Sequence, residues 1–217
     1  MAQARPQAAV RGPTFIRLLA RLARADVAPP GATLPDHLGQ WLDWKHALAL
    51  SSALDGRPDV ADMAVDATDE LHAECAQARA TLTHAIQHDP QLAAGAHVPD
   101  EPDFGPFRQA CLARQRAMQA SIGRLRGRLR DALARGSVDA ARLAEVDAVM
   151  EAALTPREHR LLEQVPALLE QRYERLRVAQ QTPWLDGFRR DMQSVLLAEL
   201  DVRFQPVNAL LAALRTH

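Results

Sequence analysis

The stretch that decides the fold is FGPFRQACLARQRAMQASIGRLRGRLRDALAR, residues 104–135. Its apolar residues recur every three, four or seven positions, and this spacing places them on one face of an α-helix. The residues on this face are Phe104, Phe107, Cys111, Met118, Ile122, Leu125, Leu129 and Leu133. The stretch therefore predicts one long amphipathic helix that ends at Gly136.

Arginines flank this apolar face on both of its edges. At about 100° per residue, one edge carries Arg124, Arg128 and Arg135, and the other carries Arg108, Arg126 and Arg130. The opposite face carries the small residues Ala113, Ala117, Ala120, Gly123, Gly127 and Ala134. We expect a central helix that packs on two sides, with arginines that pair with carboxylates of the acidic segment described below or of a partner.

Two packing faces on one helix are more than a small subdomain covers alone, so the sequence predicts a homodimer. The candidate interaction residues on this helix are Leu125 and Leu129 on the apolar face and Arg124, Arg126, Arg128 and Arg130 beside it. The apolar face is either an intermolecular face or part of the internal core.

The composition of the 217-residue chain favours helices throughout. It contains 41 Ala, 30 Leu and 25 Arg, which head the helix-propensity ranking, whereas only 4% of the residues are aromatic. Strands favour β-branched and aromatic residues, so the composition argues against a sheet protein. We expect an all-α fold, a helical bundle with long amphipathic helices.

Periodicity and Pro/Gly clusters divide the chain into four segments. We expect a flexible tail at 1–13, an N-terminal helical subdomain at 14–88, a Pro/Gly-rich linker or long loop at 89–106 and a long-helix bundle at 107–217. Helical patterns begin near Thr14, Pro35 and Val65. Either the N-terminal segment is a separate subdomain, or the linker is a loop that crosses one bundle.

Local start and stop signals predict the C-terminal helices. Ser137 caps a short helix, and the sequence TPRE at residues 155–158 is a capping box that opens the next one. Pro166 predicts a kink in that helix, and Pro206 bends or breaks the last helix.

The chain has 26 basic and 27 acidic residues, but they are unevenly placed. Residues 25–104 have a net charge of −11, whereas residues 105–136 have a net charge of +7. Nucleic-acid binding by the Arg-rich helix is therefore one alternative function. Its arginines are split between two edges and no aromatic residues lie among them, so we expect nucleic acid not to be the partner.

Trp41 and Trp44 are two of the three tryptophans, and they lie within one turn of a predicted helix. Large apolar residues supply much of the buried area of an Ala-rich bundle, so we expect them in the core. The alternative is that they anchor a protein interface, because tryptophan is enriched in binding hot spots.

Histidines, cysteines and aspartates give only weak signals for a metal site. The pairs about one turn apart are His84 and His88, His72 and Cys75, Asp43 and His46, and Asp69 and His72. A metal site needs further ligands that the sequence does not identify, so we expect no metal and no cofactor. No nucleophile elbow, phosphate loop, HExxH or CxxC motif occurs, which argues against an enzyme. A metal-dependent helical-bundle enzyme therefore ranks only third among the hypotheses.

The two cysteines, Cys75 and Cys111, lie far apart and the chain has no secretory signal, which is typical of a cytoplasmic protein. The longest uncharged stretch, residues 204–214, is about half of the roughly 20 residues that a membrane span requires. We therefore expect a cytoplasmic protein without a transmembrane segment.

Three stretches resemble the proteobacterial domain of unknown function 3348 family. They are TFIRLLARL at 14–22, LPDHLGQWLDWKHALALSSAL at 34–54 and LLAELDVRFQPVNALL at 196–211. The likeness covers nearly the whole chain and transfers no catalytic or binding residue to it. It implies a cytoplasmic accessory to an envelope-spanning complex. With the residue patterns, it leads us to expect a non-enzymatic protein that binds other proteins as a scaffold.

Overall fold

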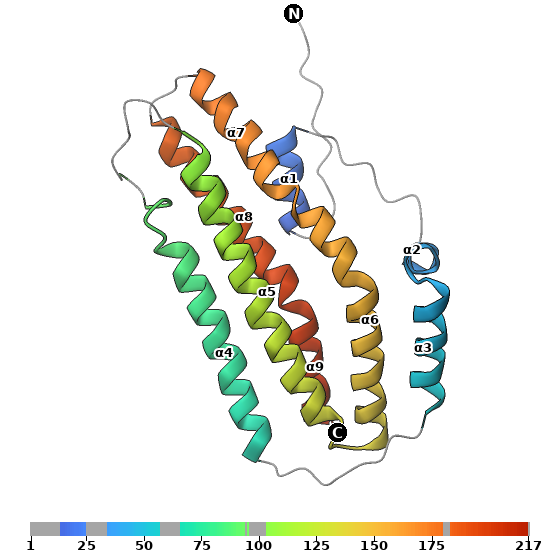
Figure 1. Cartoon of the computed structure of the whole chain (residues 1–217). Coiled ribbons are helices and arrows are strands. Elements are labelled where there is room, and N and C mark those ends of the chain that lie inside the picture. The colour runs from blue at the N-terminus through green and yellow to red at the C-terminus, as the bar shows by residue number, and fades with distance from the viewer. Residues whose placement is uncertain are drawn as a thin grey trace, which may run out of the picture.

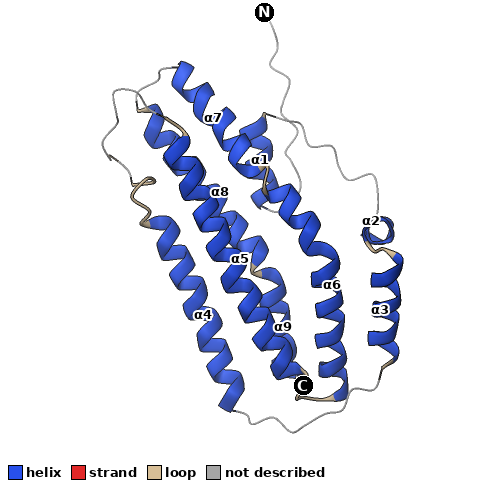
Figure 2. Cartoon of the chain, in the orientation of Figure 1, coloured by secondary structure: helices blue, strands red, loops and turns tan. Residues whose placement is uncertain are grey.

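The structure is a computed structural model that describes residues 14–24, 34–56, 66–93, 95, 103–179 and 183–216. The predicted tail at 1–13 lies outside these residues. Within them the chain forms helices joined by short turns and contains no strand, which confirms the all-α prediction (Figure 2). The helices are α1 (Thr14–Ala23), α2 (Leu34–Trp41), α3 (Trp44–Asp55), α4 (Asp66–Gln87), α5 (Gly105–Leu133), α6 (Val138–Leu162), α7 (Val165–Ala179), α8 (Trp184–Arg203) and α9 (Gln205–Thr216).

The predicted long helix, α5, lies at the centre of the bundle and packs against α4, α6, α8 and α9 (Figure 1). Every residue of its predicted apolar face is buried. Leu125 and Leu129, at the middle of this face, are completely enclosed by the chain's own helices. The prediction that these two leucines form an intermolecular face is therefore wrong, because the neighbouring helices already cover them.

The face of α5 opposite this core was expected to receive a second helix, and no described helix of the chain itself packs there, so the predicted homodimer stays a prediction. Ala113, Ala117 and Ala120 are exposed, and a Cβ atom added at Gly123 or Gly127 would meet only open space. The flanking helices α4 and α6 pack instead at the edges of the apolar face, where the arginines of α5 reach their carboxylates. Among the described helices, none covers the small-residue face.

An aromatic cluster closes one end of the bundle and joins α5, α7 and α8. The ring of Tyr173 lies 5.1 Å from the rings of Trp184 and Phe188, and both of these contacts are edge-to-face. Phe104 and Phe107, at the start of α5, complete the cluster. Edge-to-face packing of this kind is favourable beyond the area that it buries, so it fixes how the three helices meet.

Helices α1 and α4 contribute to the same continuous core as α5 to α9. Phe15 and Leu22 of α1 and Leu71 and Ile86 of α4 belong to this core; α1 packs against α7 and α8, and α4 against α5 and α8. The described part of the predicted linker forms turns around Asp89. The Asp89 carboxylate accepts a hydrogen bond from the Arg114 side chain of α5 at 2.9 Å. Helix α5 begins at Gly105, close to the predicted boundary.

The helix predicted to begin near Pro35 is in fact two helices. The chain leaves α2 after Trp41, and α3 starts after Asp43, which has extended backbone angles and accepts a hydrogen bond from the His46 backbone N–H at 2.9 Å. An aspartate in this position is a strong N-cap, so it starts a new helix rather than continuing the old one.

Helix α6 runs without interruption from Val138 to Leu162, so the predicted helix start at residues 155–158 is wrong. Its N-cap is Ser137, as predicted, whose hydroxyl accepts from the Ala140 backbone N–H at 3.2 Å. A capping box is worth only about 1 kcal/mol, and the packing of α6 against α5 and α3 outweighs it.

The chain instead breaks between α6 and α7, so the predicted kink at Pro166 is a complete break just before it. Pro166 is the second residue of α7, where a backbone N–H would have no helical partner. Pro206 stands at the same position of α9, and the predicted break there is confirmed at Phe204.

Substitution of the two candidate N-caps, Ser137 and Thr155, should show which of them starts a helix. Ser137→Ala should lower the free energy of unfolding by about 1 kcal/mol, because it leaves a first-turn N–H without its acceptor. Thr155→Ala should change it by less than about 0.5 kcal/mol, since alanine suits a helix interior. Urea denaturation of both variants measures the difference. Equal losses would contradict a continuous α6.

A charge in the middle of the α5 apolar face should unfold the chain. Leu125→Asp buries an unpaired carboxylate and should lower the free energy of unfolding by about 3–5 kcal/mol. Ala120→Asp, on the exposed face of the same helix, is the matched control and should stay within about 1 kcal/mol of the wild type. Circular dichroism melting curves report both. A folded monomer of Leu125→Asp obtained from a wild-type dimer would restore the intermolecular interpretation.

Candidate interaction surface

Helices α2 and α3 form a unit on the outer side of α6, away from α5 (Figure 1). α3 packs against α6, and no other described helix contacts it to a comparable extent. Ala53 is the only described residue of α3 that is fully buried. One side of α3 is therefore held by the bundle, and the other side faces outward.

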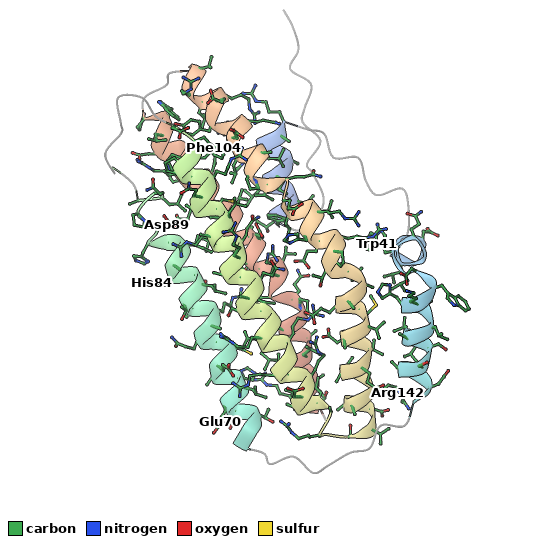
Figure 3. The ribbon with its side chains drawn as sticks, viewed as in Figure 1. Trp41, Glu70, His84, Asp89, Phe104 and Arg142 are labelled. Atoms are coloured by element: carbon green, nitrogen blue, oxygen red, sulfur yellow. The ribbon has the colours of Figure 1, made fainter. Side chains whose placement is uncertain are left out.

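Two arginines of α6 attach the ends of this unit through backbone carbonyls. Arg157 donates to the Gln40 carbonyl at 3.2 Å, and its guanidinium lies 5.6 Å from the centre of the Trp41 ring. Arg142 donates to the Gly56 carbonyl at 3.1 Å. Figure 3 shows Trp41 and Arg142 at opposite ends of the contact between α3 and α6. The two arginines thus fix α3 antiparallel to α6.

The outward side of α3 is apolar. The side chains of Trp44, Leu48 and Leu54 are 79%, 56% and 53% exposed, and Ala47 and Ser51 between them are exposed as well. At about 100° per residue these five positions occupy an arc of about 120° on one side of the helix. We call them the α3 outer face. Single exposed leucines are common on proteins, but a tryptophan and two leucines on one helical face form a patch typical of an interaction site.

The core placement predicted for both tryptophans is therefore wrong for Trp44. Trp41 is partly buried beside Arg157, whereas Trp44 points away from the bundle. The break at Asp43 causes the difference, because it starts α3 in a new direction between the two tryptophans. Leu48 and Leu54 were missed as surface residues, since their helical spacing is the same as that of a core face.

Acidic residues flank the α3 outer face at its ends. Asp43 and Asp55 lie at its two ends, and Asp36 is exposed on α2. Lys45 is the only lysine or arginine between residues 34 and 56, so this segment has a net charge of −2. The hydrogen bond from the His46 backbone N–H lowers the pKa of Asp43, which therefore stays ionised at neutral pH.

Most of the arginines singled out on α5 are paired within the chain. Arg126 contacts Asp147 at 2.7 Å and Glu151 at 3.2 Å, and Arg130 contacts Asp147 at 2.9 Å. Arg128 pairs with Glu74 of α4. Arg124 is exposed and has no ion pair with a described residue.

The prediction of internal pairing is thus confirmed, although the partners differ from those expected. The partner of Arg128 belongs to the acidic segment 25–104, but both partners of Arg126 lie on α6. α6 follows α5 directly in the chain and packs along the edge that carries Arg126, so its carboxylates are the nearest ones.

A pocket of about 300 Å³ lies between α5, α6 and the junction of α8 with α9. Arg126, Thr155, Glu158, His159 and Arg203 are among the side chains that line it.

Deeper than this pocket, Glu199 is only 1% exposed and accepts hydrogen bonds from Gln115 at 3.0 Å and from Arg203 at 2.9 Å. Burial raises the pKa of Glu199, although Arg203 and Gln115 oppose the shift. Arg203 also contacts Glu158, so one guanidinium is shared by two carboxylates.

The predicted pairs of ligand-type residues are not brought into a common site. Among the residues that the structure describes, no group of three or more histidines, cysteines or carboxylates is arranged to hold a metal ion. His84 and His88 stack with their ring centres 3.9 Å apart, and Asp43 and His46 contact each other at the start of α3. Cys75 is buried in the core and His72 only partly so. The absence of a metal remains a prediction.

No helix among the described ranges combines the length and the apolar character that a membrane span needs.

A family model described as "Protein of unknown function (DUF3348)" matches residues 1–216 of the chain. No curated protein and no solved structure matches the chain.

Glu199 should give the stability of the protein a measurable dependence on pH. Because burial raises its pKa above that in the unfolded chain, the folded state binds the proton more tightly, and stability falls as the pH rises through the raised pKa. Glu199→Gln removes this contribution. The melting temperature of the variant relative to the wild type should therefore be higher at about pH 8 than at about pH 5.

Calorimetry at both pH values measures this difference. Glu174→Gln, at an exposed carboxylate of α7, is the control and should show a much smaller change with pH. A Glu199→Gln difference that does not vary with pH would show that the buried carboxylate is not destabilised by its surroundings.

Proposed function

We propose that this chain, which belongs to the DUF3348 family of proteins of unknown function, acts by binding other proteins and not by catalysis. In this proposal the bundle of α1 and α4 to α9 is a scaffold, and the unit of α2 and α3 is the part that meets the partner. The protein works in the cytoplasm as an accessory to an envelope-spanning complex, the role that the sequence resemblance implied.

The observation that carries the proposal is the exposure of the α3 outer face. Burying a large apolar side chain stabilises a protein by about 1.5–3 kcal/mol, and three such side chains are left in water on one helix. Tryptophan, the residue at position 44, is among the residue types that contribute most to protein interfaces. A partner that covers Trp44, Leu48 and Leu54 gains the free energy that the fold itself does not use.

The polar groups of the bundle support a structural role. The charged side chains around the pocket pair with one another, as in the contacts of Arg126 with Asp147 and of Arg203 with Glu199. Burial raises the pKa of Cys111 to about 12, so its thiol stays protonated and is a poor nucleophile. Both cysteines are free and buried, which suits a reducing compartment.

Nucleic-acid binding has less support. Arg126, Arg128 and Arg130 are engaged by carboxylates of α4 and α6, and binding to phosphates would require these pairs to break. Arg124 alone does not make the contiguous basic surface that a nucleic acid needs.

Site-specific photo-cross-linking in cells that naturally make the protein tests the proposal. With a benzophenone amino acid in place of Leu48, irradiation should yield a discrete cross-linked species. The same group in place of Ala117, on the exposed face of α5, should yield much less. Trp44→Ser should reduce the cross-link at position 48 at least fivefold, on the order expected for loss of a hot-spot residue.

Cross-linking that is equal at positions 48 and 117, or insensitive to Trp44→Ser, would contradict a specific interaction at this surface. Loss of the cross-link is interpretable only if the Trp44→Ser protein melts like the wild type. That result is expected, because Trp44 contributes little to the core.

A further inference from the structure

We infer that the partner element on the α3 outer face is a single amphipathic α-helix whose apolar stripe is flanked by lysines or arginines. This inference rests on the proposed protein-binding function and names the class of partner. It follows from the shape, the size and the charge of the face.

The shape of the face fits a helix. Trp44, Ala47, Ser51 and Leu54 follow one another at intervals of three and four residues, with Leu48 beside them. This is the spacing by which two helices pack their side chains into each other's grooves. α3 is 12 residues long, or about 18 Å, so a partner helix of three to four turns would cover it.

The size of the face argues against a second copy of the chain as its occupant. Three large side chains, one of them largely and two of them about half exposed, offer apolar area on the order of a few hundred Å². A stable protein dimer usually buries about 800 Å² on each partner. The face is therefore closer to the size of a site for one helical segment than to that of a dimer interface.

The charge around the face also distinguishes the possible occupants. Two copies of α3 would bring Asp43 against Asp55 if they packed antiparallel, and each aspartate against its own copy if they packed parallel. Lys45 is the only lysine or arginine on α2 and α3 that could offset this repulsion. A basic helix would instead be attracted by the aspartates in either orientation.

Two further features strengthen the attraction for a basic segment. Glu145 of α6 lies beside Gly56 at the C-terminal end of α3, where Arg142 already donates to the Gly56 carbonyl. The exposed indole of Trp44 offers a face on which a lysine or arginine can stack. A partner with an apolar stripe and basic flanks satisfies all of these groups together.

Binding of synthetic helical peptides to the full-length protein tests this inference. The probe is a labelled peptide of about 18 residues with leucines at heptad positions and lysines on both flanks. One comparison peptide has glutamates in place of the lysines, and another has the lysine peptide's composition in scrambled order. Fluorescence anisotropy should show that the basic amphipathic peptide binds at least tenfold more tightly than either, with an advantage that shrinks as salt is added.

Variants then assign the binding to the α3 outer face. Trp44→Ser and Leu48→Ser should each weaken binding of the basic peptide at least fivefold. Val178→Ser is the matched control, because Val178 on α7 is 75% exposed, almost as much as Trp44. The double variant Asp43→Asn, Asp55→Asn should remove most of the preference for lysines, and asparagine at position 43 still caps α3.

Several results would overturn the inference. Equal binding of the lysine and glutamate peptides would show that the acidic surroundings do not select the partner. Equal binding of the lysine peptide and its scrambled version would show that binding does not require an apolar stripe on a helix. Absence of any peptide binding would also exclude this class of partner. A dimer in sedimentation experiments that is lost in Leu48→Ser would identify a second copy as the occupant. Each of these outcomes leaves the cross-linking test of protein binding unaffected.

Discussion

Burial of one face of α5 is the constraint on which the rest of the structure depends. The face extends from Phe104 to Leu133, and α4, α6, α8 and α9 all contact the helix that carries it. Once these helices surround it, the arginines at its two edges lie next to α4 and α6. Their long side chains then meet Glu74, Asp147 and Glu151 without further rearrangement. The ion pairs of the bundle are thus a consequence of how its apolar core is closed.

Hydrophobic periodicity predicted α5 and α4 well because both helices bury one stripe of their surface along their length. Proline predicted the break between α8 and α9 for a local steric reason that packing does not override. The capping box at Thr155 failed for the opposite reason. A local signal of about 1 kcal/mol competes there with side-chain packing along the whole of α6, and packing prevails.

The candidate surface could be predicted only in part. The tryptophan pair attracted attention because tryptophan is rare in this chain, and Trp44 does lie on the surface. Leu48 and Leu54 could not be separated from core residues, since an apolar helical stripe looks the same whether the chain or a partner covers it. Leu125 and Leu129 illustrate the converse error, because a stripe that was assigned to a second copy is covered from within. A single sequence shows that one face of a helix is apolar, but it does not show whether the chain itself or a partner covers that face.

The attachment of α2 and α3 through carbonyl oxygens bears on how the protein can evolve. Arg142 and Arg157 hold groups that every amino acid provides, so these contacts do not depend on the side chains at positions 40 and 56. Ala53, which needs to stay small against α6, is the main restriction on α3 itself. The positions of the α3 outer face are exposed, so they can change without weakening the contact of α3 with α6. Selection can therefore alter partner preference in one short helix while the bundle beneath it keeps its stability.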